Sequence, residues 1–374
     1  MRPHSDELER VLKDSLSRKL LVDVFHGSNR VAQELVATDW QFDGNLETEI
    51  KHTAAFTLVL PSIAGESYLP EGVDGTYSPF RATAYLSIEL SAGEFSERVG
   101  LGWGRMAAIP VGRDVTIDAS NAGAGEVSVV TVLRFEWESF ESKVKRRGFR
   151  LPEQAPSLSS TYSELRRITD MPVAENVPDK PLPVAPAYEA REGGRLRAVQ
   201  MLYENLGGIG VVSPSGEWTC VPHAWSETVV GKLYVGPDGT VTDIPYSIDT
   251  TGIYNVIVGN FEDPVTRQPL TAVAVDNNSA IAVGTDYGEN TGYISDDLVT
   301  TQAAANAAVE RELAKVRASQ QYEVPVQCII NPLLELGDII SVEGWKRPLV
   351  GRVKKYSLSD SALMTVTLEA RRAL

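Results

Sequence analysis

The stretch NPLLELGDIISVEGWKRPLVGRVKKYSLSDSALMTVTLEA, residues 331–370, predicts three β-strands joined by two short turns. Within its last strand, Met364, Val366, Leu368 and Ala370 alternate with Thr and Glu residues. This period of two is typical of a strand with one face buried and the other in water. Polar residues are plentiful, but none of them forms a recognisable catalytic set. We therefore expect this β unit to contribute shape rather than chemistry.

Alternation with the same period runs through the first third of the chain. It is clear in AYLSIEL, residues 84–90, and Asp-Gly turn signals at 43–44 and 74–75 separate such runs. The run EVSVVTVLRFEW, residues 126–137, is apolar on both faces for part of its length, as a strand covered on both sides would be. Residues 19–138 are therefore predicted to form one antiparallel β domain, either a barrel or a sandwich.

Helical periodicity is confined to a few segments. Residues 1–18 have apolar residues at helical spacing, and Ser5 with the acidic residues after it suits an N-cap region. Residues 300–319 are alanine-rich and give the most strongly predicted helix of the chain. Four residues of this helix share one face and are expected to be buried: Ala305, Val309, Leu313 and Val316.

The middle of the chain has a different composition. Short helical segments flank a proline-rich stretch at 171–194, which is too poor in backbone donors for a helix or sheet and is predicted to be an exposed connection. Ser160 or Thr161 is placed to cap one of these helices. Another helix is predicted at 195–206, ended by Gly207 and followed by hairpins.

These patterns divide the chain into five segments. They are an N-terminal helix, a first β domain, a helical and proline-rich connection, a helix with hairpins, and a final region with strands, helix 300–319 and the C-terminal β unit. The predicted bounds are 1–18, 19–138, 139–194, 195–248 and 249–374. The order of strands, helix and hairpin occurs twice, although no repeat of fixed period is present.

The composition excludes several classes of protein. A net charge of −15, from 35 basic and 50 acidic residues, argues against a dedicated nucleic-acid binder, which needs a cationic face. Cys220 and Cys328 form no CxxC motif and are expected to be reduced, buried thiols. The N-terminus lacks the apolar core of a secretory signal, and no run of about 18 apolar residues predicts a transmembrane helix. We expect synthesis in the cytoplasm and no stable membrane insertion.

No motif predicts a metal or phosphate site. His4, His26, His52 and His223 are scattered singly and are expected to lie at the surface or to bond locally. The GLGWG sequence at 100–104 lacks the Lys-Ser/Thr of a phosphate-binding loop, so a turn or close backbone packing explains its glycines better.

Three other candidates have plain structural explanations. Ser215 is expected at a hairpin turn and lacks the glycine pattern of a nucleophile elbow. Asp296 and Asp297 precede a helix, where its dipole favours negative charge, so we expect them to cap the helix rather than to act as a general acid or base. Residues 276–278 miss the EF-hand spacing and predict a turn. We therefore expect no catalytic residue, no metal ligand and no cofactor.

The chain also contains one dense basic run and six tryptophans. The run KVKRRGFR at 143–150 is predicted to be a solvated helix face, with contact to an acidic partner as the alternative. Five of the six tryptophans lie in or beside predicted strands, where core packing is their default role: Trp103, Trp137, Trp218, Trp225 and Trp345.

The order of the parts is itself informative. A strand-rich opening with DWQFDGN at 39–45 precedes RLRAVQMLYENLGGIGVVSPSGEWTCVP at 195–222, and the helix at 300–319 precedes INPLLELGDIISVEG at 330–344. This layout resembles the tail-tip hub, or minor tail, proteins of long-tailed, siphovirus-like bacteriophages, particularly those that infect actinobacteria. It is more remotely similar to the baseplate hub proteins of contractile-tailed phages. The resemblance covers nearly the whole chain and is firmest over residues 195–374.

The resemblance implies a β-rich α+β fold with two related antiparallel β-barrel-like domains, 19–138 and 249–374, and smaller α/β elements. It also implies a homotrimeric ring that closes the tail tube at the virion tail tip. The implied partners are a distal tail protein, a tape measure protein and other minor tail or receptor-binding proteins, with DNA only in transit. Some relatives carry further C-terminal enzyme modules; this chain is expected to have none, because Leu374 directly follows the last predicted strand. Net negative charge would suit a channel through which DNA slides without sticking.

Two other functions remain open at this stage. A cell-wall-degrading tail enzyme would need a cluster of His, Asp, Glu or Cys residues that the linear sequence does not contain. A cell-surface carbohydrate-binding module would need clustered exposed aromatic residues, for which Trp218, Trp225 and Tyr234 are the local candidates. A structural component of the tail tip, without enzymatic activity, is the function we expect.

Overall fold

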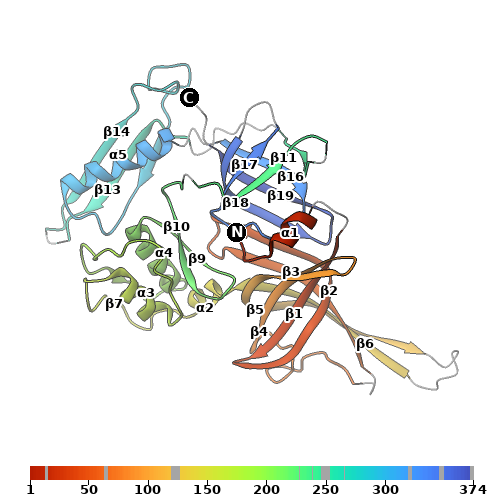
Figure 1. Cartoon of the computed structure of the whole chain (residues 1–374). Helices are drawn as coiled ribbons and strands as arrows, with labels where there is room; N and C mark the ends of the chain where they lie inside the picture. The colour runs from red at the N-terminus through yellow and green to blue at the C-terminus, as the bar shows by residue number, and fades with distance from the viewer. Residues whose placement is uncertain are drawn as a thin grey trace.

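The structure is a computed structural model, and strands dominate it. Most strands belong to one large sheet, while the longer helices lie in two smaller units beside it (Figure 1). The predicted β-rich fold is therefore confirmed. The structure describes the whole chain except residues 13–15, 63–65, 119–126, 227, 238, 246–252, 265, 319–321, 345–348 and 371–374.

Six N-terminal strands pair in a closed cycle, which we call the first set. Their order is β1-β4-β5-β6-β3-β2, and β1 also pairs with β2, so every strand has at least two partners. All these pairings are antiparallel. The strands are β1 (Ser17–His26), β2 (Asn29–Asn45), β3 (His52–Ser62), β4 (Ala82–Ala92), β5 (Phe95–Asp118) and β6 (Val127–Ser139).

The hairpin of β5 and β6 extends away from the other strands of the first set (Figure 1). Its outward face carries Val111 and Val115, with Val59 on the neighbouring β3, and these side chains are 50%, 40% and 48% exposed. Val132, which pairs with Val59, is only partly buried. The expectation that 126–137 is covered on both sides is therefore wrong, because a projecting strand meets the core with one face only.

Six further strands form a second set. The antiparallel order β17-β18-β19-β16-β12 is extended by β11, which pairs with β17 in parallel. An isolated bridge between Val235 and Val241 brings the end of β11 next to β12. The strands are β11 (Gly231–Tyr234), β12 (Val241–Asp243), β16 (Tyr322–Ile329), β17 (Ile339–Glu343), β18 (Leu349–Ser359) and β19 (Leu363–Ala370).

One hydrophobic core runs through both sets of strands. It contains Leu86 and Phe56 of the first set together with Val366 and Leu368 of the second, all fully buried. The predicted alternation in β19 is confirmed, since Met364, Val366, Leu368 and Ala370 are all inside. Helix α1 (Asp6–Val11) packs on this core through Leu8, and Ser5 caps it as predicted by accepting from the backbone N–H of Leu8 at 3.1 Å. The helix is shorter than the predicted 1–18.

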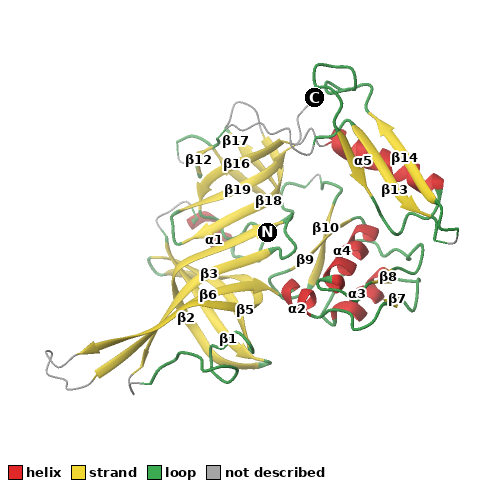
Figure 2. Cartoon of the chain, turned by 180° about the vertical axis from the view of Figure 1, so that it is seen from behind, coloured by secondary structure: helices red, strands yellow, loops and turns green. Residues whose placement is uncertain are grey.

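A unit of short helices and strands follows the first set (Figure 2). Ser160 caps α3, as one of the two predicted candidates, and Gly207 ends α4 with a φ of 98°. The proline-rich stretch is anchored rather than fully exposed, because Val173 and Leu182 are buried in this unit's core. The elements are α2 (Glu141–Arg146), β7 (Glu153–Gln154), α3 (Thr161–Thr169), β8 (Ala187–Tyr188), α4 (Gly194–Leu206), β9 (Gly208–Val212) and β10 (Trp218–Pro222).

A second small unit has its own core. Helix α5 (Gln302–Ala318) covers one face of a three-stranded sheet of β13 (Val256–Glu262), β14 (Pro269–Val275) and β15 (Thr291–Ile294) (Figure 2). The predicted inner face of the helix is confirmed, since the following residues are buried: Ala305, Val309, Leu313 and Val316. The five-segment division itself, including the boundary near 248 outside the described residues, stays a prediction.

Candidate functional site

The two sets of strands meet where β2 of the first set pairs with β18 of the second. Strands β2 and β18 pair antiparallel over five residue pairs, from Lys355 opposite Asn45 to Ser359 opposite Gln41. These backbone bonds join residues more than 300 positions apart, so the two sets form one continuous sheet. We call this region the junction.

Gly44 makes the close approach at the junction possible. It lies opposite Tyr356, and a Cβ on Gly44 would come within 2.6 Å of the Tyr356 ring. The predicted turn at 43–44 is therefore wrong, because both residues are paired within β2. A glycine after Asp is a turn signal in sequence, but here the missing side chain makes room for an aromatic ring from a distant strand.

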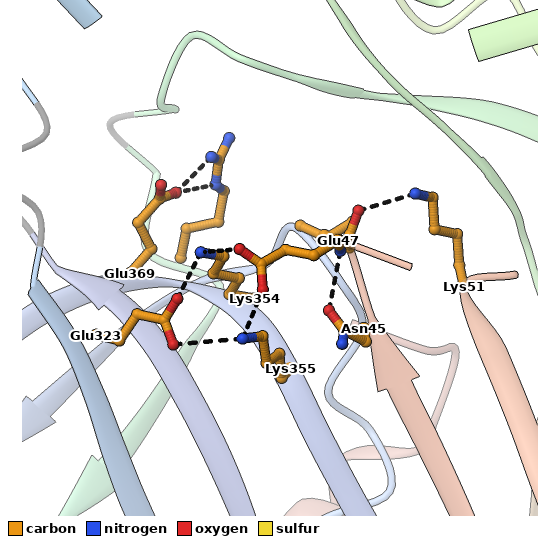
Figure 3. A network of polar contacts seen from close by, with 9 residues as sticks. Asn45, Glu47, Lys51, Glu323, Lys354, Lys355 and Glu369 are labelled. Carbon is orange, nitrogen blue, oxygen red and sulfur yellow. Dashed lines mark hydrogen bonds and ion pairs between the residues drawn. The ribbon is translucent and has the colours of Figure 1, made fainter. Parts of the chain in front are cut away.

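A network of four charged side chains closes one end of the junction (Figure 3). Lys354 Nζ lies 2.6 Å from one oxygen of Glu47 and 2.5 Å from one of Glu323. Lys355 Nζ lies 2.6 Å and 3.4 Å from the other oxygens of the same two carboxylates. Glu47 belongs to the turn after β2, Glu323 to β16 and both lysines to β18. The network therefore links three segments across the two sets.

The electrostatics of the network favour its charged form. Burial opposes ionisation of Glu47, but the hydrogen bonds from Lys354 and Lys355 outweigh it and lower the pKa of Glu47. Burial likewise disfavours the charge of Lys354, but hydrogen bonds to Glu323 and Glu47 outweigh it and raise the pKa of Lys354. The turn that carries Glu47 is itself fixed, because the Lys51 ammonium donates to the carbonyl oxygens of Leu46 and Thr48, at 2.8 Å and 2.6 Å.

Arg2 is buried beside Tyr356 of the junction. Its guanidinium donates to the carbonyl oxygens of Pro332 and Leu334, at 2.5 Å and 2.6 Å, and to the Tyr356 hydroxyl at 2.7 Å. The Tyr356 ring in turn lies near Phe42 of the first set, with ring centroids 6.3 Å apart. One buried cation therefore holds the loop before β17 against β18.

His52 and Glu141 mark the place where the helical unit meets the first set. Glu141 is fully buried and accepts hydrogen bonds from the Ser139 hydroxyl and from the backbone N–H of Val212, the latter at 2.9 Å. Burial raises the pKa of Glu141. His52 stacks on Phe42, and burial, with smaller effects of Arg2 and Lys51, lowers the pKa of His52 to about 3. A cavity of about 230 Å³ is lined by His52, by the β9–β10 hairpin and by residues 335–338 of the loop before β17.

The histidines and cysteines either bond locally or are buried. His4, His26 and His223 bond locally as predicted, to a carbonyl oxygen of Arg2, a carbonyl oxygen of Thr76 and the Glu204 carboxylate respectively. His52 is the exception, since it is buried. Burial raises the pKa of Cys220 to about 11 and that of Cys328 to about 12, so both thiols stay protonated at neutral pH. The part of the chain that the structure describes contains no group of three His, Cys, Asp or Glu side chains suited to a metal ion.

The remaining candidates have structural roles. Gly100 and Gly104 lie inside β5, where a Cβ would meet Tyr85 and Trp137 respectively, so close packing is the correct explanation of this motif. Ser215 is exposed, and its hydroxyl pairs only with that of Ser213, at 2.7 Å, among the described residues. Asp276 accepts from the backbone N–H groups of two residues that follow it, which is the predicted turn.

The expected cap of α5 is wrong, whereas Trp218 has the expected position in a core. Thr301, not Asp296 or Asp297, caps α5, since its hydroxyl accepts from the backbone N–H of Ala304 at 3.2 Å. Asp296 instead accepts from the backbone N–H of Leu298 in the turn before the helix.

The three aromatic candidates for a carbohydrate site, Trp218, Trp225 and Tyr234, do not form one exposed cluster, because Trp218 is fully buried. Trp103, Trp137 and Trp225 lie in or beside strands, and Trp345 lies outside the described residues. None of the described helices is long and apolar enough to cross a membrane.

Comparison with known proteins shows a relationship in structure only. No protein-family model and no curated protein sequence matches the chain. The tail protein from Neisseria meningitidis MC58 matches with a TM-score of 0.59 over 94% of this chain and 97% of that one, at 12% identity. The 43 kDa tail protein of prophage MuSo2 from Shewanella oneidensis matches with a TM-score of 0.57 over 94% and 98%, also at 12% identity.

A chain of the Francisella PdpA–VgrG complex is also similar, with a TM-score of 0.51 at 8% identity, over 96% of this chain but only 59% of its own length. The two tail proteins, in contrast, are matched over nearly their whole length. This chain therefore has the fold of these tail proteins, and the resemblance predicted from the sequence is confirmed at the level of the fold.

Proposed function

We propose that this chain is a structural subunit of a phage tail tip, a baseplate hub that closes the tail tube and links it to host-recognition parts. The observation that carries the proposal is the fold, which is similar to tail proteins over 94% of the chain. The junction supports it, because one continuous sheet with a shared core suits a rigid load-bearing part. No catalytic role is part of the proposal.

The proposed assembly is a homotrimeric ring. Each chain contributes two six-stranded sets, so three chains would present six similar surfaces to a sixfold tube. In this proposal the two sets correspond to two barrel-like domains, joined at β2 and β18. The small units with α2–α4 and with α5 would lie outside the ring.

The proposed partners are the distal tail protein, the tape measure protein and other minor tail or receptor-binding proteins. DNA would pass through the ring during host cell entry without stable binding. The net charge of −15 favours this, because an acidic passage provides no binding well for phosphate. A lumen lined by basic side chains would contradict the proposed gating of DNA.

The first test is the mass of the purified chain by light scattering behind a sizing column, together with its copy number in virions. A trimer in solution, or a monomer that occurs three times per virion at the tail tip, supports the hub. A stable monomer that is absent from virions would refute it. Cell-wall binding and hydrolysis would then be the activities to measure.

A further inference from the structure

The proposed hub function does not account for the basic residues at 143–150. Helix α2 buries Glu141, Ser142 and Val144 and turns its basic residues outward. This helix lies between the first set of strands and helices α3 and α4 (Figure 2). The basic residues of α2 therefore lie on the side of the helix that is not buried.

These charges line a hollow of about 590 Å³, which we call the basic hollow. Its lining includes four cations, Arg105, Lys143, Arg146 and Arg147, and one carboxylate, Asp170. Arg105 comes from β5, Asp170 follows α3, and the other three come from α2 and its end. A second hollow of about 640 Å³ adjoins it and shares Arg146. Arg146 therefore faces both hollows.

The positive charge of the basic hollow is only partly neutralised. Arg147 pairs with Asp170 at 3.0 Å, and Arg105 lies 3.9 Å from Glu138. Among the described residues, neither Lys143 nor Arg146 has a carboxylate within ion-pair distance; the Lys143 ammonium lies 3.3 Å from the centre of the Phe140 ring instead.

Burial adds to the electrostatic cost of this arrangement. The Arg105 side chain is only 14% exposed, and burial, followed by the charge of Arg146, lowers the pKa of Arg105. Cations that are held together and partly removed from water are stabilised by an incoming anion. Four cations line this hollow in a chain with a net charge of −15, and among the described residues two of them have no carboxylate partner.

We propose that the basic hollow binds an acidic polypeptide segment of a partner protein, through carboxylates that reach Arg146, Lys143 and Arg105. Guanidinium groups match carboxylates in a bidentate geometry, and Arg105 and Arg146 line the basic hollow from two different elements. A continuous phosphate chain fits less well, because Asp170 and Glu138 lie beside the cations and the net charge of −15 opposes a long polyanion that extends beyond the hollow. Separate carboxylates can be placed between these acidic groups.

The test is fluorescence anisotropy of a labelled oligoglutamate peptide titrated with the full chain at low and at raised salt. A labelled DNA duplex of equal charge is the second probe. The wild-type chain is expected to bind oligoglutamate in a salt-sensitive manner and more tightly than DNA. Arg146→Glu is expected to weaken peptide binding about tenfold or more, because it removes one charge-assisted bond and adds repulsion. Arg146→Lys is expected to retain part of the binding.

Arg311→Glu is the matched control. Arg311 is exposed on α5, in another unit, and the substitution changes the net charge by the same amount. It is expected to leave peptide binding within about twofold of wild type. The proposal is overturned if the peptide does not bind, or if the Arg146 and Arg311 variants lose peptide binding equally. It is also overturned if the Arg146 substitution weakens binding of the duplex but not of the peptide. This test is independent of ring assembly, so its failure would leave the proposed hub function standing.

Discussion

At the scale of single residues, the junction depends on the missing side chain of Gly44 as much as on the Tyr356 ring. Tyr356 fills the space that a side chain at 44 would occupy, and its hydroxyl accepts from Arg2. The Tyr356 ring therefore contacts a buried cation through its hydroxyl and the backbone of Gly44 on the opposite strand. Substitutions here act on the contact between the two sets rather than on either set alone.

Gly44→Ala is expected to lower the free energy of unfolding by about 1–3 kcal/mol, because the new methyl group overlaps the Tyr356 ring and forces β2 and β18 apart. Urea unfolding followed by tryptophan fluorescence measures the loss. Gly148→Ala is the control, since a Cβ there meets only Arg191 O at 3.4 Å. It should stay within about 0.5 kcal/mol of wild type. Equal effects of the two substitutions would show that the Gly44 contact is not tight.

His52 is expected to make stability depend on pH. The unfolded chain protonates His52 below an ordinary pKa of about 6.5, whereas burial holds the pKa of the folded state at about 3. The unfolded state therefore binds more protons between these values, and stability falls as pH is lowered through this window. Glu141 acts in the opposite direction, because burial raises its pKa, so stability from Glu141 is lost as pH rises through that raised value.

His52→Gln removes one of these two contributions and keeps the other. The free energy of unfolding, measured from pH 7 down to pH 4, is expected to fall less steeply than in wild type. His223→Gln is the control, because His223 is partly exposed and pairs with Glu204 on the surface. An unchanged slope in His52→Gln would show that His52 is not held neutral in the folded state.

At the scale of elements, sequence patterns predicted those features whose cause lies within a few residues. Ser5 and Ser160 as caps, Gly207 at the end of α4 and the inner face of α5 depend on local periodicity and local hydrogen bonds. The alternation in β19 belongs to the same group. Each of these features depends on residues within one or two turns of a helix or a few positions of a strand. The sequence of that segment therefore contains the information needed to predict it.

The junction could not be predicted in this way, because its partners are far apart in the sequence. Asp43 and Gly44 have the composition of a turn, and only the distant Tyr356 explains why Gly44 lies inside a strand. Lys354 and Lys355 likewise gave no signal, since two adjacent lysines are common on exposed strands. Their meaning depends on Glu47 and Glu323, which come from two other segments.

The network of Glu47, Glu323, Lys354 and Lys355 is expected to stabilise the junction modestly. All four side chains are partly exposed, between 20% and 50%, so water screens them. A double-mutant cycle with Glu47→Gln and Lys354→Gln should give a coupling free energy of about 0.5–1 kcal/mol at low salt, decreasing as salt is added. Zero coupling at low salt would mean that the four side chains lie close together without stabilising the junction.

At the scale of the whole molecule, the distribution of the cores decides which parts unfold together. One cluster of buried residues spans both six-stranded sets, whereas the unit of α5 and its three-stranded sheet has a separate cluster. A shared core couples the sets, because neither can open without exposing apolar surface of the other. This coupling is the rigidity that the proposed hub function requires.

The coupling can be tested with two matched core substitutions, Leu368→Ala in β19 and Leu313→Ala in α5. Both leucines are buried, at 0% and 1% exposure, and each truncation is expected to cost about 2–5 kcal/mol. Hydrogen exchange measured by mass spectrometry reports where protection is lost. Leu368→Ala should lower protection in β16–β19 and also in β1–β6, because the two sets share one core and the β2–β18 pairing. Leu313→Ala should lower it only in α5 and β13–β15. If Leu368→Ala left β1–β6 unchanged, the two sets would be independent folding units, and the rigidity that the hub proposal requires would have to come from contacts between subunits.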